Sequence, residues 1–163
     1  MFYIHGGSYL TGSGSGKDAT PLCEEGVVFV SMNYRLGVLG GLTLPELLSE
    51  SNTSGNYALQ DQRAALVWVR RNIHLFGGDP DRITISGESA GAMSVAAHYA
   101  LPRSAPYFAQ AIIMSGNDDS LSFAEAARDG DRFAAFHRCR GPDRAACLRH
   151  VDALELVNAQ TVV

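Results

Sequence analysis

The pentapeptide Gly-Glu-Ser-Ala-Gly at residues 87–91 constrains what this chain can fold into more than any other feature. The residues before it, 82–86, alternate apolar and polar side chains, as is typical of a short buried strand. The residues after it, 92–100, are rich in helix formers. A Gly-x-Ser-x-Gly between a strand and a helix predicts a nucleophile elbow, a sharp turn that holds Ser89 in a strained backbone conformation above the sheet edge. The glycines are needed because a Cβ there would collide with the neighbouring strand and helix.

Strand-like and helix-like segments alternate along the chain, which predicts an α/β fold with a mostly parallel sheet and covering helices. Besides the strand before the elbow, we expect strands at residues 2–4, 27–33 and 110–114. The segment 27–33 is a continuous apolar run, as is typical of a strand buried on both faces. The connection from residue 34 to 55 is long enough to suggest a functional loop or packed surface structure.

The strongest helix pattern covers residues 56–76 and is ended by Gly77-Gly78 and Pro80. Its predicted buried face consists of apolar residues at helical spacing: Leu59, Leu66, Val69 and Ile73. Beyond Ser122 the chain is also expected to be helical.

Composition fits an ordinary globular protein, with 163 residues, 46% of them hydrophobic, 18% charged and a net charge of −4. We therefore expect one domain over residues 1–163, with a core of its own. The sequence contains no basic patch with interleaved aromatic residues, which would have predicted nucleic-acid binding. It also contains no apolar run long enough to cross a membrane. The opening Met1 to Ile4 resembles the end of a strand, so we expect the chain to begin within a fold.

The glycine-rich loop at residues 12–17 is not expected to bind phosphate. A P-loop needs a glycine five residues before the Gly-Lys pair and a serine or threonine after it. Those positions are Thr11 and Asp18.

A second candidate site element, His5-Gly6-Gly7-Ser8-Tyr9, directly follows the first predicted strand. Acyl transfer through a serine needs backbone N–H donors aimed at the oxygen that becomes negative in the tetrahedral intermediate. α/β-Hydrolases take one from the residue after the nucleophile and others from a His-Gly-Gly-type loop. Together with the elbow, this segment predicts an oxyanion hole.

These segments resemble the type-B carboxylesterase and cholinesterase family of α/β-hydrolases. The resemblance rests on Phe-Gly-Gly-Asp-Pro at 76–80, on the elbow, on Asn-Tyr-Arg-Leu-Gly at 33–37 and on Gly-Asn-Tyr-Ala-Leu-Gln-Asp-Gln at 55–62. It continues through Met-Ser-Gly at 114–116 to Cys-Leu-Arg at 147–149. It covers nearly the whole chain but only the central N-terminal portion of the family, so we expect a partial α/β-hydrolase domain truncated at both ends.

The resemblance implies that Ser89 is the nucleophile and that Gly7, Ser8 and Ala90 donate to the oxyanion, with Gly6 supporting the loop. It implies no cofactor or metal, and a small-molecule carboxylic ester as substrate. Glu88 is expected either on the pocket floor beside the nucleophile or in a buried hydrogen-bonding role.

The resemblance also implies two structural links. Arg35 and Asp61 match positions that form a buried ion pair, which would hold the long connection onto a helix. Cys139 and Cys147 match a small disulfide loop, although two cysteines at this spacing could also be buried free thiols. The disulfide would imply an oxidising compartment, hence a secreted protein or one of the endoplasmic reticulum lumen. Cys23 is expected to be a buried thiol.

Three departures from the family pattern affect the prediction. Ser8 stands where members often carry a third glycine, which places a Cβ near the pocket. His-Gly-Gly-Ser-Tyr also resembles the neuroligin branch of adhesion proteins, which have lost the nucleophile that is present here as Ser89. The segment from Asn117 to Phe123 lacks the tryptophan that hydrolytic relatives usually place in the acyl pocket.

A serine nucleophile needs a histidine base and an acid, which follow it in this fold on loops after later strands. Asp118 or Asp119 with His137 or His150 would satisfy the order, but none follows a late strand. His5 belongs to the oxyanion loop, whereas His74 and His98 are expected to be packed or surface helix residues. We therefore expect the acid and base to lie outside this chain.

Three functional hypotheses follow. The protein is a serine carboxylic-ester hydrolase that needs the rest of its parent chain to complete the fold. Alternatively, it is a neuroligin-like adhesion protein with a vestigial serine, or these 163 residues form an inactive truncated product.

Overall fold

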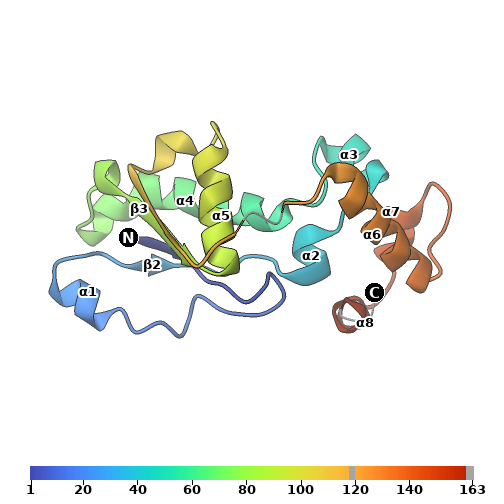
Figure 1. Cartoon of the computed structure of the whole chain (residues 1–163), viewed down its shortest axis with the longest axis horizontal. Helices are drawn as coiled ribbons and strands as arrows, with labels where there is room; N and C mark the ends of the chain where they lie inside the picture. Colours follow the sequence, from blue (N-terminus) through green and yellow to red (C-terminus); the bar gives the residue numbers. More distant parts are fainter. Residues whose placement is uncertain (118–119, 161–163) are drawn as a thin grey trace. The chain divides into compact units, whose positions relative to one another are not determined.

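A computed structural model describes residues 1–117 and 120–160 (Figure 1). The described chain divides into two compact units. The first contains residues 1–34 and 59–117, and the second contains residues 35–58 and 120–160. The expectation of a single partial domain over residues 1–163 stays a prediction.

The first unit is built on a four-stranded sheet in the order β2-β1-β3-β4. Its strands are β1 (Phe2–Ile4), β2 (Val30–Ser31), β3 (Thr84–Glu88) and β4 (Gln110–Met114). Every neighbouring pair is parallel, and the register sets Ile4 opposite Gly87 and Gly87 opposite Ile113. This parallel sheet with its helices confirms the predicted α/β class.

Two strands differ from their predicted form. The run 27–33 was expected to be a long strand buried on both faces, but β2 covers only Val30–Ser31 and both residues are half-buried. It pairs only with β1 in the described sheet, so one of its sides has no neighbouring strand. β3 begins later than expected because residues Pro80–Arg82 form a 3₁₀ turn, η2, which is capped by the Asp79 carboxylate.

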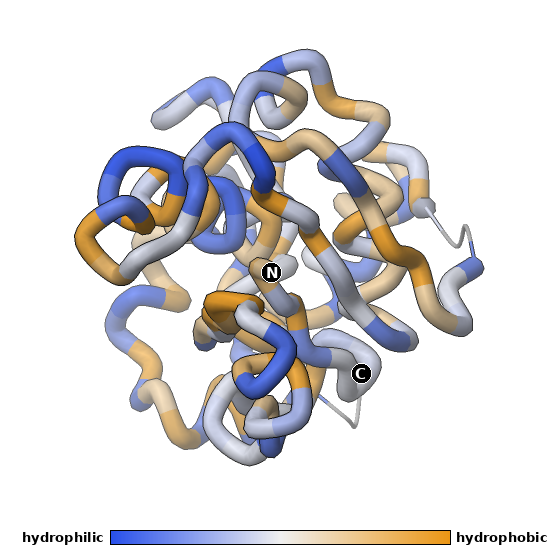
Figure 2. Tube along the Cα trace, turned by 90° about the vertical axis from the view of Figure 1, so that its left-hand side faces the viewer, coloured by the Kyte–Doolittle hydropathy of each residue, from blue (hydrophilic) through white to orange (hydrophobic). Residues whose placement is uncertain are grey.

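Helix α4 (Tyr57–Asn72) continues into a 3₁₀ turn, η1 (Ile73–Phe76), and ends at Gly77 in the left-handed region with φ of 80°. Leu66, Val69 and Ile73 are buried as predicted, whereas Leu59 is only half-buried. Helix α5 (Ala90–Ala100) follows the elbow and packs on β1, β3 and β4. Figure 2 shows hydrophobic stretches alternating with hydrophilic ones along the trace. The side chains at the centre of this unit are fully buried: Phe2, Ile4, Leu66, Ile85 and Val95.

The remaining short elements of this unit are α1 (Thr20–Glu24) and the 3₁₀ turn η3 (Ala105–Tyr107). α1 interrupts the connection between β1 and β2 and has no buried residue. Cys23 lies on it and is exposed, so the expectation of a buried thiol is wrong.

The second unit is helical and consists of α2 (Gly37–Gly41), α3 (Pro45–Ser51), α6 (Phe123–Phe136), α7 (Arg144–Leu148) and α8 (Ala153–Ala159). The helical character expected beyond Ser122 is therefore confirmed, and Ser122 with Glu125 forms a capping box for α6. Its buried core gathers residues from all but α2 and α3: Leu44, Phe133, Ala134, Cys139, Ala145, Leu148 and Ala159.

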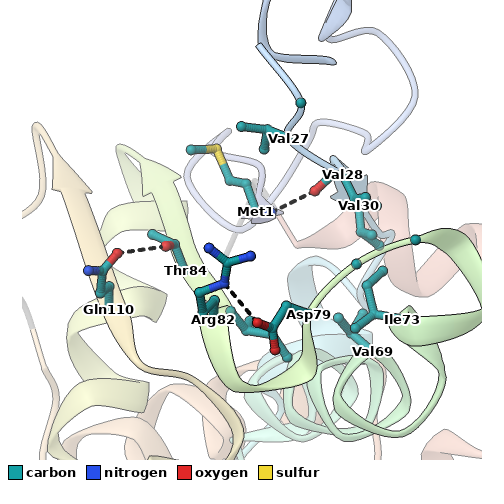
Figure 3. Close-up of a pocket in the computed structure, with 14 residues that line it drawn as sticks. Met1, Val27, Val28, Val30, Val69, Ile73, Asp79, Arg82, Thr84 and Gln110 are labelled. Atoms are coloured by element: carbon teal, nitrogen blue, oxygen red, sulfur yellow. Dashed lines mark hydrogen bonds and ion pairs between the residues drawn. The ribbon is translucent and has the colours of Figure 1, made fainter. Parts of the chain in front are cut away.

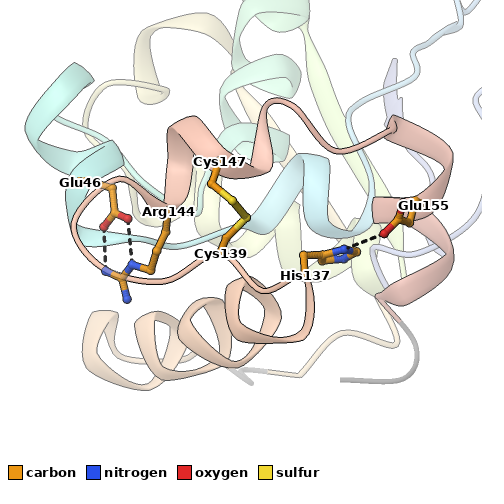
Figure 4. Close-up of a disulfide and its surroundings, with 6 residues drawn as sticks. All are labelled: Glu46, His137, Cys139, Arg144, Cys147 and Glu155. Atoms are coloured by element: carbon orange, nitrogen blue, oxygen red, sulfur yellow. Dashed lines mark hydrogen bonds and ion pairs between the residues drawn. A yellow bond between two sulfur atoms is a disulfide. The ribbon is translucent and has the colours of Figure 1, made fainter.

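A disulfide and an ion-pair cluster link the helices of this unit (Figure 4). Cys139 and Cys147 are bonded, with their Cα atoms 5.6 Å apart, which confirms the disulfide implied by the resemblance. Arg144 binds both carboxylate oxygens of Glu46 on α3, at 3.0 and 2.9 Å, and also pairs with Asp131 on α6. Covalent and charged links therefore join α3, α6 and α7.

Among residues 1–117 and 120–160, no helix is long and apolar enough to cross a membrane.

Candidate active site

Ser89 occupies the turn between β3 and α5 with a backbone conformation that few non-glycine residues adopt. Its φ is 55° and its ψ is −125°. The Ser89 N–H donates to the Met114 carbonyl oxygen of the neighbouring strand at 3.0 Å, and the Ser89 carbonyl accepts the Met93 N–H at 3.0 Å. These bonds hold the strained residue between sheet and helix. The side chain lies at the carboxyl end of a central strand, the edge where open parallel sheets bind ligands.

The two glycines of the elbow are required by close backbone approach. A Cβ on Gly87 would stand 2.3 Å from the Gly91 carbonyl oxygen, and a Cβ on Gly91 would stand 2.1 Å from the Ile4 carbonyl oxygen. Both are far shorter than van der Waals contact, and both partners are backbone atoms that cannot swing aside. The glycine pattern in the sequence therefore has the steric cause expected of it.

The loop after β1 lies against the elbow. A Cβ on Gly6 would stand 2.6 Å from the Glu88 carbonyl oxygen and 3.1 Å from the Ser89 Cβ. Gly7, Ser8 and Tyr9 all have positive φ, at 112°, 55° and 58°. Three consecutive residues of this kind turn the backbone sharply, and the turn is closed by the Leu10 and Thr11 N–H groups, which both donate to the Gly7 carbonyl.

The backbone N–H groups expected to bind the oxyanion are those of Gly7, Ser8 and Ala90. Among the described residues, none of the N–H groups of Gly7, Ser8 and Ala90 donates a hydrogen bond. Ala90 is the first residue of α5, where an N–H has no intrahelical partner. Unused donors beside a nucleophile are what an oxyanion hole requires.

His5 anchors the base of this loop. It is buried, its Nδ1 lies 2.8 Å from the Gly6 carbonyl oxygen, and its ring stacks on Tyr34 with centroids 4.4 Å apart. The Tyr34 hydroxyl donates to the His5 carbonyl at 2.6 Å. Because Nδ1 faces a carbonyl, it carries the proton. His5 therefore supports the loop and is not placed as a base for Ser89.

Glu88 is exposed beside the loop, with its Oε2 3.2 Å from the position a Gly6 Cβ would take. The choice between a place on the pocket floor and a hydrogen-bonding role for this carboxylate stays a prediction. Its backbone ends β3 on the site edge, and the side chain is free to face solvent or ligand.

No histidine acts on Ser89 within the described residues, where its hydroxyl makes no hydrogen bond. His98 is buried with both ring nitrogens engaged, and His74 is exposed. His137 and His150 belong to the second unit, and the candidate acids Asp118 and Asp119 lie outside the described residues. The expectation of a base and acid beyond this chain stays a prediction.

A network of buried polar side chains next to the elbow was not predicted from the sequence. Ser94 Oγ lies 3.1 Å from the Tyr9 hydroxyl and 3.1 Å from the Ala90 carbonyl oxygen, and accepts from Gln62 Nε2 at 3.1 Å. Gln62 Oε1 lies 3.1 Å from His98 Nε2. A signal was available, since Gln62 falls on the buried face of α4, four residues before Leu66. A polar residue on an apolar face predicts a buried partner.

The Arg35–Asp61 ion pair stays a prediction, since Arg35 belongs to the second unit and Asp61 to the first. Within its own unit, the Arg35 guanidinium lies 5.3 Å from the centre of the Tyr57 ring.

The first unit contains a cavity of about 370 Å³, drawn in Figure 3, and no residue of the elbow lines it. It is lined by Met1, Thr84 and Gln110, at the amino ends of β1, β3 and β4, together with residues of α4 and η1. Ser89 follows the opposite, carboxyl end of β3. This cavity is therefore not the site of chemistry at Ser89.

Comparison with known proteins matches the whole chain, residues 1–163, to the model of the carboxylesterase family. An acetylcholinesterase from Danio rerio is 42% identical over 98% of this chain and 26% of its own length. A para-nitrobenzyl esterase from Bacillus subtilis is 40% identical over the full chain and 32% of its length. A fumonisin B1 esterase from Sphingopyxis macrogoltabida is 46% identical over 71% of this chain and 22% of its length. The chain thus spans about a third or less of the length of these curated relatives.

Proposed function

Because this chain belongs to the carboxylesterase family, we propose that the protein hydrolyses carboxylic esters through an acyl-enzyme formed at Ser89. The observation that carries the proposal is the strained Ser89 backbone at the carboxyl end of β3, with the Gly6-Gly7-Ser8 loop packed against it. An elbow of this kind exposes a serine hydroxyl to ligand on one side and to backbone donors on the other.

In the proposed reaction, Ser89 Oγ attacks the ester carbonyl carbon and loses its proton to a base. The carbonyl oxygen becomes an oxyanion, which accepts hydrogen bonds from the backbone N–H groups of Gly7, Ser8 and Ala90. The intermediate collapses, the alcohol leaves with a proton, and the acyl group stays on Ser89. Water then attacks the acyl-enzyme, which releases the acid and restores the serine.

Three features support the oxyanion hole. The three N–H groups donate to no other described residue, so they are available to an oxyanion. Gly6 lets the loop approach the elbow to a distance that no Cβ allows. The Ser8 side chain is exposed, so its Cβ leaves the backbone N–H available.

The base and acid are proposed to lie on parts of the protein outside this chain, in the order serine, acid, histidine. Glu88, exposed at the edge of the site, is proposed to line the pocket beside the nucleophile, where its charge would favour cationic groups on a substrate. A small-molecule carboxylic ester is the proposed substrate class. The similar proteins include a para-nitrobenzyl esterase and a fumonisin B1 esterase, which supports this class.

We also propose that the protein matures in an oxidising compartment, as a secreted or luminal protein. The Cys139–Cys147 disulfide supports this, because structural disulfides persist where thiols are not kept reduced.

Labelling with a fluorophosphonate probe tests the proposed function. The probe phosphonylates an activated serine and displaces fluoride, so mass spectrometry of the full-length protein should place one adduct on Ser89. Ser89→Ala should abolish it, whereas Ser86→Ala, a buried serine on the same strand, should leave labelling intact. Absence of labelling on wild-type protein at any probe concentration would overturn the proposal and favour a non-catalytic binding role.

A further inference from the structure

A chain of buried polar side chains connects the oxyanion loop to helices α5 and α4. It runs from the Tyr9 hydroxyl to Ser94 on α5, then to Gln62 on α4, then to His98 on α5 and finally to Ser104, with each link 3.0 or 3.1 Å long. The four residues beyond Tyr9 are at most 1% exposed. Buried polar networks of this kind are rigid when every member is satisfied.

The hydrogen positions in this network of side chains follow from which of its atoms can donate and which can accept. Gln62 Nε2 donates to Ser94, so Gln62 Oε1 must accept from His98 Nε2. His98 is then protonated on Nε2, and its Nδ1 accepts from the Ser104 hydroxyl. Ser94 has one proton for two acceptors, the Ala90 carbonyl and the Tyr9 oxygen. The Ser94 hydroxyl donates to either oxygen at 3.1 Å, and when it donates to Ala90 the Tyr9 hydroxyl is able to donate to Ser94 in turn.

Tyr9 needs such support because its backbone is strained. Its φ of 58° follows the φ of 55° at Ser8, and neither residue is a glycine. Residues in this region persist only where surrounding contacts hold them. The Tyr9 ring packs edge-on to Tyr34 with centroids 6.4 Å apart, and its hydroxyl reaches Ser94.

The link at Ser94 sits where it can set the spacing of two donors. Among the described residues, the Tyr9–Ser94 contact is the one hydrogen bond that joins residues 5–9 to α5. Ser94 also contacts the carbonyl of Ala90, the residue whose N–H begins α5. One hydroxyl therefore touches both the loop that carries Gly7 and Ser8 and the turn that carries Ala90.

We propose that Gln62, Ser94 and Tyr9, held by His98, are positioning residues that fix the oxyanion loop relative to the elbow. The inference rests on the proposed function, since it gives these residues a role in the same site. They touch no reacting atom. They act by fixing the distance from the N–H groups of Gly7 and Ser8 to the N–H group of Ala90.

His98 suits this role because it stays neutral. Burial, with a smaller contribution from the nearby Arg63 on α4, lowers its pKa to about 4. A cationic ring would lose the Nδ1 acceptor that Ser104 needs. At neutral pH the links from Gln62 through His98 to Ser104 therefore keep one arrangement of donors.

The deciding variant is Tyr9→Phe in the full-length protein, because it removes one oxygen from a half-buried ring and leaves the fold intact. We expect kcat for p-nitrophenyl acetate, per fluorophosphonate-titrated site, to fall about tenfold while KM stays within about twofold. This is less than the 10²–10³ of a lost oxyanion donor, because the donors remain and only their placement loosens. Ser94→Ala should give a similar loss of kcat, and Ser94→Thr should restore most of it.

A second pair of variants separates positioning from folding. His98→Gln keeps an amide N–H near the place of Nε2, whereas His98→Leu removes the donor at similar size. We expect His98→Gln to retain kcat per titrated site and His98→Leu to lower it. Ser86 is equally buried but makes no hydrogen bond to these polar side chains, so Ser86→Ala should leave kcat unchanged. Loss of stability alone would lower the titrated fraction without changing kcat per site.

Failure of the inference and failure of the proposed function give different results. If wild-type protein is phosphonylated at Ser89 and Tyr9→Phe matches its kcat per site, the positioning role is overturned and the esterase proposal stands. If wild-type protein is not phosphonylated, the esterase proposal fails. Amide hydrogen exchange over residues 5–11 then decides: faster exchange in Tyr9→Phe supports the network, and unchanged exchange overturns it.

Discussion

Gly6 and Ser89 lie so close that a Cβ on Gly6 would stand 3.1 Å from the Ser89 Cβ. The same Cβ would stand 2.6 Å from the Glu88 carbonyl oxygen, a backbone atom in the last residue of β3. The loop after β1 and the elbow after β3 are thus in contact at the carboxyl ends of two adjacent parallel strands. This contact, between segments more than eighty residues apart in sequence, assembles the candidate site.

Gly6→Ala is expected to displace the loop from the elbow. Its φ lies outside the positive range, so the substitution adds steric conflict without backbone strain. Moving reacting groups by about 1 Å can cost roughly 10²-fold in rate. We expect the rate constant for phosphonylation of Ser89 to fall by about that factor, measured by fluorophosphonate labelling over time.

The matched control is Gly16→Ala, where an added Cβ meets no atom within 4 Å. It should label at the wild-type rate. Wild-type labelling by Gly6→Ala as well would contradict the proposed role of the loop.

The buried His98 should make the protein less stable as pH falls below about 6.5. Its pKa is lowered from 6.5 to about 4, chiefly by burial, so the unfolded state binds a proton at a higher pH than the folded state does. The loss of folding free energy due to His98 is absent at pH 7 and grows as pH drops from about 6.5 to 4, up to about 3 kcal/mol. Urea unfolding at several pH values should show this decline.

Other groups also titrate in this range, so the comparison is with His98→Gln, which has no ring to protonate. The stability difference between wild type and His98→Gln should shift in favour of the variant as pH falls from about 6.5 to 4. Parallel curves for the two proteins would show that His98 is not the group responsible.

The Cys139–Cys147 disulfide is expected to stabilise the second unit by restricting its unfolded state. The sequence separation is 8 residues. A loop of this size predicts a stabilisation of about 2.5 kcal/mol from chain entropy. Cys139→Ala/Cys147→Ala should lower the free energy of unfolding by roughly that amount in urea titrations.

Cys23→Ala is the control for this pair, because Cys23 is an exposed free thiol on α1. It should change stability by less than about 0.5 kcal/mol. If the double variant behaved as Cys23→Ala does, the disulfide would have no measurable role in stability.

Glu46→Gln should weaken the packing of α3 against α7. Burial raises the pKa of Glu46, but the hydrogen bonds and charge of Arg144 outweigh it and hold the pKa below its usual range. The stabilisation is therefore present above the unfolded pKa of Glu46 and is lost as pH falls through its folded value. We expect a loss of about 1 kcal/mol at pH 7, since the pair is bidentate but partly solvated.

Asp129→Asn provides the comparison, because Asp129 pairs with Arg132 in an exposed position on α6. Surface pairs of this kind contribute little, so this variant should unfold as wild type does. The Glu46→Gln deficit should also shrink on acidification. A deficit that stayed constant down to pH 3 would exclude the carboxylate charge as its cause.

Local patterns were enough to predict several parts of the structure. The spacing of Leu66, Val69 and Ile73 predicted the buried face of α4, and the glycines at 87 and 91 predicted an elbow. In each case the cause lies within a few residues of chain. Helical periodicity is a local property, and the elbow places a strand, a turn and a helix in one short segment.

Other features depended on neighbours distant in sequence. The exposure of Cys23 follows from α1 having no covering layer, and the short β2 follows from pairing with β1 alone in the described sheet. Gln62 was visible in the sequence as a polar residue on an apolar face. Its partners, 32 and 36 residues away, were not.

The sequence alone determined that this chain is an α/β protein of a recognisable family, with Ser89 at the turn between a strand and a helix. Only the tertiary structure decided that Gly6 touches that turn, that Tyr9 is tied to Ser94, and that His98 is held neutral between two side chains. Secondary structure and turns follow from short-range sterics and periodicity, which a single segment carries. Hydrogen bonds across a sheet and between helices depend on which segments the fold brings together.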